Sequence, residues 1–559
     1  SSMPVPLQSA AIKKLVIAAY GLNGFIAISY EIVWSRIFQV QVGTSLYAFS
    51  LMLAWYLAGI AAGSLCGARY IHRIQAPLRF FGLAQLGIAV YSVVGMYIFL
   101  LFQPVSITAI LNLGNVLIMP LVIVFPVTFL LGLIFPVVSK MYVANESEVG
   151  RGVGLIYSVN TFGCIIGSFV CGFILIGSLG TKGTIVVLSG LNILIGLTLI
   201  SIPAGEKKNK KTLALSSLAA GAALALGIFL PDPFLTTVKK AIDLVWGKDA
   251  YAVDLYYNKE SLAATTTAFG LQNKPLSKQL WINGVGMTKL CTQTKIMAHL
   301  PILLHADPKN ILVVCFGMGT TLRSAWAHKA LHCDAVELVP EIFDCFQYFH
   351  QNARTIESDS RVQRYADDGR NFLMMRSKKY DVITMDPPPP LWSAGAVNLY
   401  TKEFFALCKE HLQANGVMCV WLPPLEFSEC IMVIKTFHTV FPNTYVWGGP
   451  SRTDGEFLIG LPDAAELDVR RFFVPPADPD ILADLNEWDA FFPTLDALLK
   501  LLILSPAQVS ILDKGVPVIT DDTPYTEFPL WRSLFDPAHK LVLTARQLAA
   551  WRDATFRRQ

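Results

Sequence analysis

The sequence predicts an α-helical transmembrane bundle of about seven helices, followed by an α/β Rossmann-like domain with a small β-rich subdomain at its start. Three observations support this. Only 15% of the 559 residues are charged, whereas soluble proteins carry roughly a quarter. Residues 1–231 hold 13 Lys and Arg against 4 Asp and Glu, a net charge of +9, and the rest of the chain has a net charge of −5. From residue 309, strand-like and helix-like segments alternate. A single soluble domain is excluded.

The first region, residues 1–231, contains apolar runs long enough to cross a bilayer, which takes about 20 residues. These runs lie at 15–38, 44–68, 80–103, 116–139, 152–178, 183–203 and 212–230. The last run is short and Ala-rich, so it is either a span or a re-entrant segment. Small residues recur at Gly59, Gly63 and Gly67. They indicate close helix packing within the chain or, alternatively, a homodimer contact.

Loop charges predict how this region is oriented. If the amino terminus is cytoplasmic, the inner loops carry eleven basic residues and the outer loops only two, Arg36 and Lys182. Basic loops stay inside, so we expect this orientation. Seven complete spans would then place the rest of the chain outside. The ten cysteines show no CxxC spacing, which predicts no metal or disulfide framework and favours a reducing compartment.

Residues 232–290 form the second predicted part. Apolar and basic residues alternate at helical spacing over 234–246, which is typical of a helix lying at a membrane interface. A β-rich stretch follows over 251–288, with turns expected near Gly270 and at Asn283-Gly284.

Residues 291–450 form the predicted Rossmann-like domain, and residues 451–559 a carboxyl-terminal α/β extension. The strands are expected at ILVVCFG, AVELV, VQRYADD, YDVITMD and VMCVWLP. The intervening helices are expected near 320–331, 340–353, 370–377 and 401–413. This alternation predicts a parallel, doubly wound sheet, in which ligands bind outside the carboxyl ends of the strands.

Polar or glycine residues close four of these strands in succession. The first strand runs into Gly317-Met318-Gly319, where missing side chains let a ligand approach the backbone. The second ends at Glu337, which could accept hydrogen bonds from both ribose hydroxyls. The third ends at Asp367-Asp368-Gly369, where a carboxylate could accept from the exocyclic amine of a base, and the fourth at Asp386. Helix capping by Glu337 or Asp368, and a turn at Asp386, are the structural alternatives.

Several of these segments resemble the spermidine synthase (polyamine aminopropyltransferase) family, and more closely its membrane-fused members. They are VELVPEIFD, RVQRYADDGRNFL, YDVITMDPPPP and LYTKEFF. They are similar to the family's ribose segment, adenine segment, catalytic loop and following helix. The resemblance covers about 251–450, and TDDTPYTEF at 520–528 is like the carboxyl-terminal segment of the fused group.

This resemblance implies a class I methyltransferase/spermidine-synthase-type fold and a role for each strand end. Gly317, Met318 and Gly319 would line the nucleoside, and Glu337 would hold its ribose. The Asp367-Asp368-Gly369 segment would bind the adenine amine through Asp368. Asp386 matches the catalytic base, which takes a proton from the acceptor amine as nitrogen attacks the carbon next to a sulfonium. The implied donor is decarboxylated S-adenosylmethionine or S-adenosylmethionine, with no metal.

The sequence also departs from the family where the amine is handled. Met318 and Pro389 stand where the family carries acidic residues, and Lys289-Leu290 replaces an acidic pair. Without these carboxylates, a polycation in a closed site would lose its hydration and gain no compensating negative charge, which costs free energy. Asp367, Asp521, Asp522 and Glu527 are the acids that could substitute for them.

Three functions remain open from the sequence. The first is a transferase at the membrane acting on an amine, or, with intact S-adenosylmethionine, a methyltransferase acting on another or membrane-associated acceptor. The second is spermidine synthesis beside the membrane. The third is a polyamine or nucleoside transporter or sensor with a degenerate synthase domain. We expect lipid and a small-molecule acceptor as partners, and no nucleic acid. The expected location is a bacterial inner membrane, with segment 212–230 re-entrant and the soluble part cytoplasmic, where such donors occur.

Overall fold

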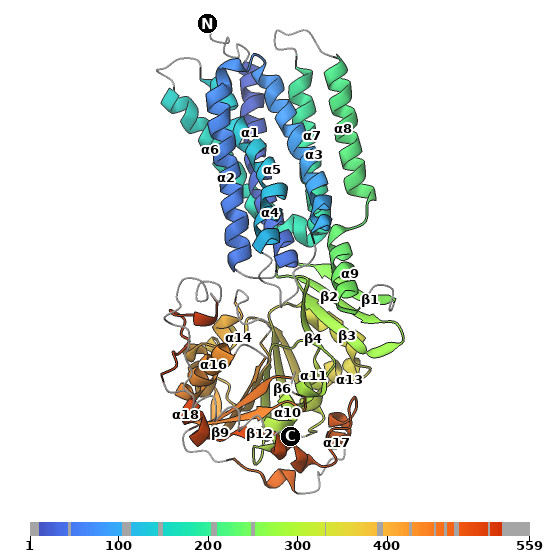
Figure 1. Cartoon of the computed structure of the whole chain (residues 1–559), viewed down its shortest axis with the longest axis vertical. Helices are drawn as coiled ribbons and strands as arrows, with labels where there is room; N and C mark the ends of the chain where they lie inside the picture. The colour runs from blue at the N-terminus through green and yellow to red at the C-terminus, as the bar shows by residue number, and fades with distance from the viewer. Residues whose placement is uncertain are drawn as a thin grey trace. The chain divides into compact units, whose positions relative to one another are not determined.

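The computed structural model divides the chain into two compact units (Figure 1). Unit 1 comprises Ser1–Tyr251, Lys259–Thr265 and Asn283–Val285, and unit 2 comprises Ala252–Asn258, Thr266–Ile282 and Gly286–Gln559. The structure describes residues 10–42, 46–102, 113–143, 149–202, 210–246, 252–329, 331–387, 395–423, 427–451, 454–462, 467–473, 480–512 and 515–527.

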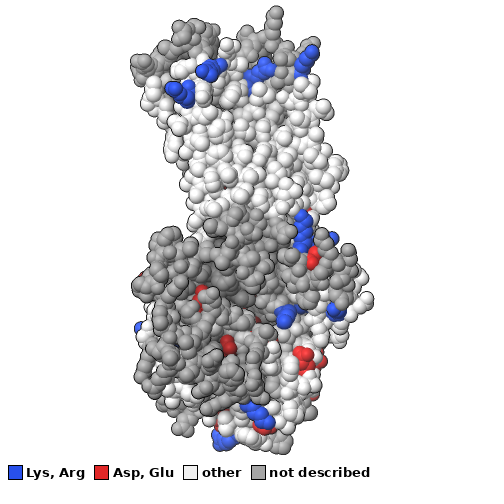
Figure 2. Space-filling view, in the orientation of Figure 1, with Lys and Arg blue, Asp and Glu red and all other residues white. Residues whose placement is uncertain are grey.

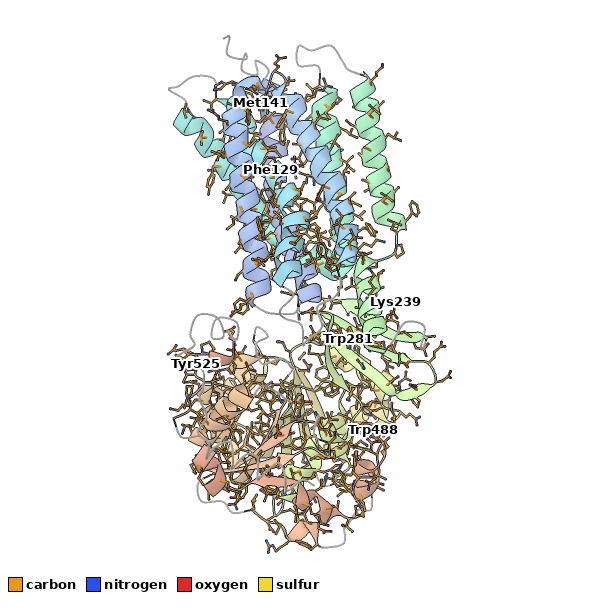
Figure 3. The ribbon with its side chains drawn as sticks, in the orientation of Figure 1. Phe129, Met141, Lys239, Trp281, Trp488 and Tyr525 are labelled. Atoms are coloured by element: carbon orange, nitrogen blue, oxygen red, sulfur yellow. The ribbon has the colours of Figure 1, made fainter. Side chains whose placement is uncertain are left out.

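Unit 1 is built from helices. They are α1 (Ala10–Val42), α2 (Leu46–Tyr70), α3 (Pro77–Ile98), α4 (Leu113–Ile123), α5 (Phe125–Tyr142), α6 (Val149–Val170), α7 (Ile176–Ser201), α8 (Lys210–Phe229) and α9 (Pro233–Trp246). Helix α1 packs against α6, α2 against α5, and α3 against α7. Apolar side chains fill the interior, and the buried Met141 is one of them (Figure 3).

A proline divides one of the predicted spans, and a glycine interrupts the helix between two others. The run at 116–139 forms two helices that meet at Val124, because Pro126 lies in the first turn of α5 and has no N–H for the preceding turn. In α7, Gly180 leaves the helical conformation with φ of 68°, a value that glycine adopts readily. Segment 212–230 is a single continuous helix, α8, which packs against α3 and α7 and does not turn back on itself.

Glycines bring the paired helices of unit 1 into close contact. A Cβ added at Gly63 of α2 would lie 2.0 Å from the carbonyl oxygen of Phe129 on α5. A Cβ at Gly163 of α6 would lie 1.9 Å from the carbonyl oxygen of Gly21 on α1. These small residues therefore serve packing inside the unit, the first of the two alternatives considered above.

Five helices of the described chain are long and apolar enough to cross a membrane by length and composition. The apolar part of α8, Leu213–Phe229, is shorter. On the face shown in Figure 2, Lys and Arg gather at the end of unit 1 that carries the amino terminus, and the middle of the unit shows no charged side chain. This distribution matches the basic loops counted in the sequence.

Unit 2 begins with a four-stranded sheet in the order β1-β2-β3-β4. Its strands are β1 (Val253–Glu260), β2 (Thr265–Leu271), β3 (Lys274–Ile282) and β4 (Val285–Lys289). The predicted turn at Asn283-Gly284 is confirmed, with φ of 51° and 76°. The turn expected near Gly270 is wrong by about two residues, because Gly270 lies within β2 and Asn273 takes the left-handed conformation.

The second sheet has eight strands in the order β12-β10-β11-β9-β8-β5-β6-β7. They are β5 (Asn310–Val314), β6 (His332–Glu337), β7 (Val362–Ala366), β8 (Tyr380–Met385), β9 (Leu412–Leu422), β10 (Asn443–Gly448), β11 (Glu456–Leu461) and β12 (Leu502–Leu504). The predicted parallel part is confirmed, because β5 pairs in parallel with β6 and β8, β6 with β7, and β8 with β9.

Helices connect and cover these strands. They are α10 (Thr292–Leu303), α11 (Thr320–Trp326), α12 (Glu341–Phe349), α13 (Ala353–Ser358), α14 (Gly369–Met374), α15 (Lys402–Glu410), α16 (Phe427–Val440), α17 (Asp480–Leu485) and α18 (Pro506–Leu512). The chain proceeds from β5 to β6 and β7 on one side and returns to β8 and β9 on the other. The direction of winding therefore reverses between β5 and β8, which is where open α/β sheets form their ligand crevice.

Candidate functional site

The loop after β5 is held in an unusual backbone conformation. Cys315, Gly317 and Gly319 have φ of 66°, 55° and 77°, the left-handed region in which a non-glycine residue such as Cys315 is strained. A Cβ at Gly319 would lie 2.5 Å from the ring of Phe346. Only glycine fits at this position, so the tight passage from β5 into α11 depends on it. Met318, between the two glycines, is 3% exposed.

Glu337 closes β6 and reaches back to this loop. Its Oε2 accepts a hydrogen bond from the Gly317 N–H at 3.3 Å, and its Oε1 accepts one from the Val339 N–H at 3.2 Å. The carboxyl is 8% exposed, and burial raises its pKa, although the backbone N–H groups act in the opposite direction. Each carboxylate oxygen has a second lone pair, so Glu337 can still accept hydrogen bonds from a ligand hydroxyl.

Asp367 and Asp368 follow β7 and have different partners. The Asp367 N–H donates to the Glu337 carbonyl at 3.0 Å, and its side chain lies 3.7 Å from Arg376. Asp368 caps α14, and its Oδ1 accepts from the N–H groups of Arg370 and Asn371, both at 3.0 Å. The capping alternative is thus observed for Asp368. Because both cap bonds use Oδ1, the second oxygen can accept from a ligand amine.

Asp386 follows β8 beside the same loop. Its N–H donates to the carbonyl of Val314 at 3.2 Å, which fixes the two strand ends next to each other. Its side chain is part-buried, and burial raises its pKa to about 7. A carboxyl with this pKa can accept a proton from a nucleophile near neutral pH.

The structure brings the predicted strand ends to one edge of the sheet. Three backbone hydrogen bonds join adjacent strand ends. The N–H of Cys315 donates to the carbonyl of Val336 at 3.0 Å, that of Asp367 to Glu337 at 3.0 Å, and that of Asp386 to Val314 at 3.2 Å. Cys315 lies among the acids, since burial and the nearby charges of Glu337, Asp386 and Asp368 raise the pKa of its thiol. These residues form what we call the strand-end site.

Four further residues near Asp386 were not predicted from the sequence. Burial raises the pKa of four neighbouring groups, and the negative charge of Asp386 raises it further. These groups are Cys291, Cys315, Cys419 and Tyr400. The Tyr400 hydroxyl donates to the Trp421 carbonyl at 3.2 Å. Tyr400 lies within the quoted LYTKEFF segment, but the cysteines carried no signal beyond their places at strand ends and in strands.

The carboxyl-terminal segment contacts α14 next to Asp368. Arg370 makes two hydrogen bonds to the carboxylate of Asp521, one of them 2.9 Å long. The Asp521 N–H donates to Glu403 at 3.0 Å. Asp521 is therefore engaged by an arginine of its own chain. Asp522 is exposed, and burial raises the pKa of the part-buried Glu527.

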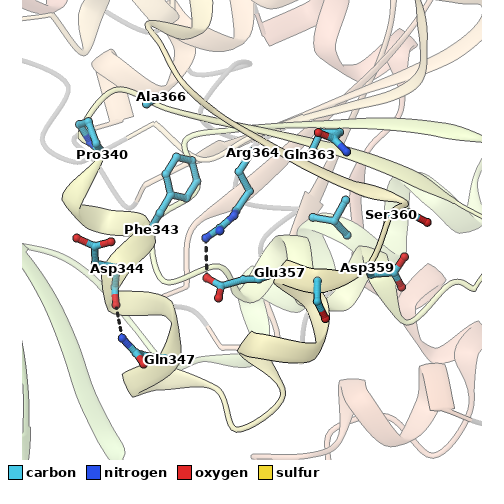
Figure 4. A pocket seen from close by; sticks show the side chains of 12 residues that line it. Pro340, Phe343, Asp344, Gln347, Glu357, Asp359, Ser360, Gln363, Arg364 and Ala366 are labelled. Atoms are coloured by element: carbon cyan, nitrogen blue, oxygen red, sulfur yellow. Dashed lines mark hydrogen bonds and ion pairs between the residues drawn. The ribbon is translucent and has the colours of Figure 1, made fainter.

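Two hollows lie elsewhere on unit 2. The first, of about 700 Å³, is seen in Figure 4, where Arg364 and Glu357 form an ion pair at 2.6 Å. The second, of about 630 Å³, includes Arg323, Asp484 and Glu487 in its lining. Neither hollow is lined by a predicted site residue. The functional candidate is therefore the strand-end site.

A reversal of winding, a glycine loop and acidic strand ends together define unit 2 as a spermidine synthase-like α/β domain, joined to a helical region with several apolar helices. Residues 290–446 match the family described as "Spermine/spermidine synthase domain". This match confirms the resemblance to the spermidine synthase family for residues 290–446.

Named relatives agree with this assignment. The chain is 30% identical to a polyamine aminopropyltransferase of Buchnera aphidicola over 154 residues, which are 27% of this chain and 53% of that protein. It is 31% identical to a polyamine aminopropyltransferase of Agathobacter rectalis over 192 residues, 32% of this chain and 66% of the relative. The chain thus spans about half of the first relative's length. The crystal structure of spermidine synthase from Thermotoga maritima is similar at 19% identity, covering 49% of this chain and 84% of that one, with a TM-score of 0.35.

Proposed function

We propose that the chain is an integral membrane aminopropyltransferase that moves the aminopropyl group of decarboxylated S-adenosylmethionine onto an amine. The observation that carries the proposal is Asp386, a carboxyl whose pKa is raised to about 7 beside the glycine loop. The names of the relatives and the family of residues 290–446 support the same reaction. Glu337 and Asp368 are proposed to hold the ribose and the adenine amine of the donor.

The reaction needs little beyond positioning and one proton transfer. The acceptor nitrogen attacks the aminopropyl carbon attached to the sulfonium, and a C–N bond forms as the C–S bond breaks. The electron pair of that bond goes to sulfur, which leaves as the neutral thioether methylthioadenosine. The proton on nitrogen passes to the carboxylate of Asp386. Because the leaving group is already activated, holding both partners in line supplies much of the rate.

The membrane part of the proposal rests on unit 1. Its long apolar helices and the gathering of basic residues at one end support insertion with that end in the cytoplasm. Helix α8 has 20 residues, which at 1.5 Å per residue reach about 30 Å, the thickness of the hydrocarbon core, and its carboxyl end lies beside Lys182. We propose that unit 2 is cytoplasmic, because the donor is found there; this side conflicts with the orientation that the loop charges favour.

The test is turnover by the full-length chain in detergent, with decarboxylated S-adenosylmethionine and a panel of primary amines. We expect methylthioadenosine as the product. Asp386→Asn should reduce kcat by at least about a hundredfold, the lower end of general-base effects, while methylthioadenosine still binds. The matched control is Asp381→Asn, at the start of the same strand, where the carboxylate accepts from the backbone at Lys309 and Asn310.

Other outcomes would point elsewhere. S-adenosylhomocysteine formed from intact S-adenosylmethionine would indicate a methyltransferase. Polyamine flux into vesicles that survives Asp386→Asn would indicate a transporter with an inactive synthase domain. Either result, without any methylthioadenosine, would contradict the proposed aminopropyl transfer.

A further inference from the structure

Asp368 is the acid that the proposed function assigns to the adenine amine, and the described residues engage only one of its two carboxylate oxygens. Oδ1 accepts from the N–H groups of Arg370 and Asn371, both at 3.0 Å. These two bonds cap α14 and fix the orientation of the carboxylate. Recognition of the amine therefore falls to Oδ2, and any cation that binds this oxygen competes with the base.

Arg370 is the cation best placed to compete, because it lies in the first turn of α14, two residues after Asp368. Among the described residues, however, its guanidinium pairs with Asp521 and not with Asp368. Nη1 donates to one carboxylate oxygen of Asp521 at 2.9 Å, and Nη2 donates to the other. Such a two-point contact between arginine and a carboxylate is strong and directional. Hydrogen bonding to Asp521 is the main cause that raises the pKa of Arg370, and the charge of Asp368 adds to it, so Asp368 is within electrostatic reach of Arg370.

The backbone around Asp521 holds its carboxylate in place. Just before it, Ile519 is buried. The N–H of Ile519 donates to the hydroxyl of Thr436 on α16, and its carbonyl accepts from the N–H of Lys402 on α15, both at 2.9 Å. The N–H of Asp521 itself donates to the carboxylate of Glu403 on α15 at 3.0 Å. The carboxyl-terminal segment is thus attached to two helices, and Asp521 meets Arg370 from a fixed position.

Without Asp521, the guanidinium of Arg370 would have a different partner. A partly buried cation needs a counter-charge, and the carboxylate of Asp368 is two residues away in the same turn. Binding there would occupy Oδ2 and remove the acceptor that the adenine amine needs. We infer that Asp521 is a positioning residue for the donor: it holds Arg370 away from Asp368, so that Asp368 can distinguish the amine of adenine from the carbonyl of a deaminated base. The inference rests on the nucleoside site of the proposed function and adds the residue that keeps this site selective.

The experiment measures, by calorimetry on the full-length chain in detergent, the Kd of methylthioadenosine and that of methylthioinosine, which has a carbonyl in place of the exocyclic amine. We expect wild type to prefer methylthioadenosine by about tenfold or more, the effect of one hydrogen bond to a charged group. Asp521→Ala should reduce this preference to less than about threefold, because the released Arg370 binds Asp368. The matched control is Asp522→Ala, at the exposed next residue, which should keep the wild-type preference within about twofold, as is usual for a surface substitution.

A double variant, Arg370→Gln/Asp521→Ala, separates this positioning role from simple support of α14. Without the guanidinium, Oδ2 of Asp368 is free again, so the preference for methylthioadenosine should return to about the wild-type value. If Asp521 only supported the helix, the double variant would be no more selective than Asp521→Ala. Thermal unfolding of each variant shows that it is folded.

Three results would overturn the inference: a wild-type chain that binds both nucleosides equally, an Asp521→Ala variant that keeps the full preference, or a double variant that does not regain it. Each of them leaves the proposed transfer standing if wild type still forms methylthioadenosine from decarboxylated S-adenosylmethionine. Conversely, the expected pattern of binding without any product would support the role of Asp521 and contradict the transfer. A chain that binds neither nucleoside and yields no product would overturn both.

Discussion

At the scale of single residues, Asp386 combines a proposed chemical role with a cost in stability. Its pKa of about 7 arises from burial, which disfavours the ionised form. In the unfolded chain the same carboxyl ionises near its ordinary value of about 3.9. Between these two values the folded protein binds a proton that the unfolded chain has released, so the stability of the folded state falls as the pH rises.

We therefore predict that Asp386→Asn is more stable than wild type above pH 7. Its advantage should grow from pH 4 to pH 7 and then level off, because Asn cannot ionise. The shift to about 7 sets an upper bound of about 4 kcal/mol at 1.36 kcal/mol per pKa unit. Thermal unfolding of both proteins between pH 4 and pH 8 measures the difference. A constant difference across this range would show that Asp386 is not desolvated.

Residue identities at the strand ends were predictable because they follow from local pattern. Glu337 and Asp386 stand at the ends of apolar runs and Asp368 follows the strand-like segment VQRYA, and parallel strands place such residues at one edge. The partners of these side chains were not predictable. Nothing in the sequence near Asp521 indicates that Arg370 binds it, since 151 residues separate them. The left-handed Cys315 was also missed, because cysteine carries no conformational signal of the kind that glycine does.

At the scale of elements, helix α17 and the segment after it supply two acids, Asp484 and Glu487, to a buried cluster on α10 and α11. Lys295 of α10 is 0% exposed, and its Nζ lies 2.6 Å from the carboxylate of Glu487. Asp484 accepts from His299 at 2.9 Å and from Ser324 at 2.6 Å. Burial raises the pKa of Asp484, but His299, Lys295 and Ser324 outweigh it, and the net shift is downward. Since α11 begins at the glycine loop, the cluster supports the position of that loop.

Removing one member of this cluster should be costly. We predict that Asp484→Ala lowers the free energy of unfolding by about 3–5 kcal/mol, because it leaves Lys295 and Arg323 with too little negative charge in a buried place. The control on the same helix is Asp480→Ala, whose partner Lys329 is 3.1 Å away and exposed; such pairs contribute less than about 1 kcal/mol. Urea unfolding of the full chain in detergent measures both. Equal effects of the two substitutions would contradict the buried cluster.

Sequence patterns anticipated most elements but not their tertiary contacts. The Asn283-Gly284 turn was predictable because both residues favour the left-handed conformation. The neighbouring prolines account for the break at Val124, but only the structure shows that the break produces two separate helices. From the sequence, Lys295 would be expected on the surface of a helix. Only the fold shows that acids from a segment almost 200 residues later in the chain bind it.

At the scale of the whole molecule, the main question is which side of the membrane unit 2 occupies. We predict the cytoplasm, because decarboxylated S-adenosylmethionine, the proposed donor, is a cytosolic metabolite. The side chain of Lys309 is 69% exposed, so Lys309→Cys offers a reactive thiol on unit 2. A membrane-impermeant maleimide should label this cysteine only after the cells are permeabilised, as judged by mass spectrometry of its peptide. Labelling in intact cells would place unit 2 outside and remove its donor.

The glycine contacts of unit 1 also limit how the molecule can move. At three contacts, two helix backbones approach so closely that a single Cβ would not fit between them. These contacts are Gly63 with Phe129, Gly163 with Gly21, and Gly82 with Gly196. Sliding one helix along its partner would bring larger side chains into these positions. Each of the pairs α1/α6, α2/α5 and α3/α7 should therefore behave as one rigid body. A shape change in unit 1 would consequently bend at Val124 or Gly180, where the helices are already interrupted.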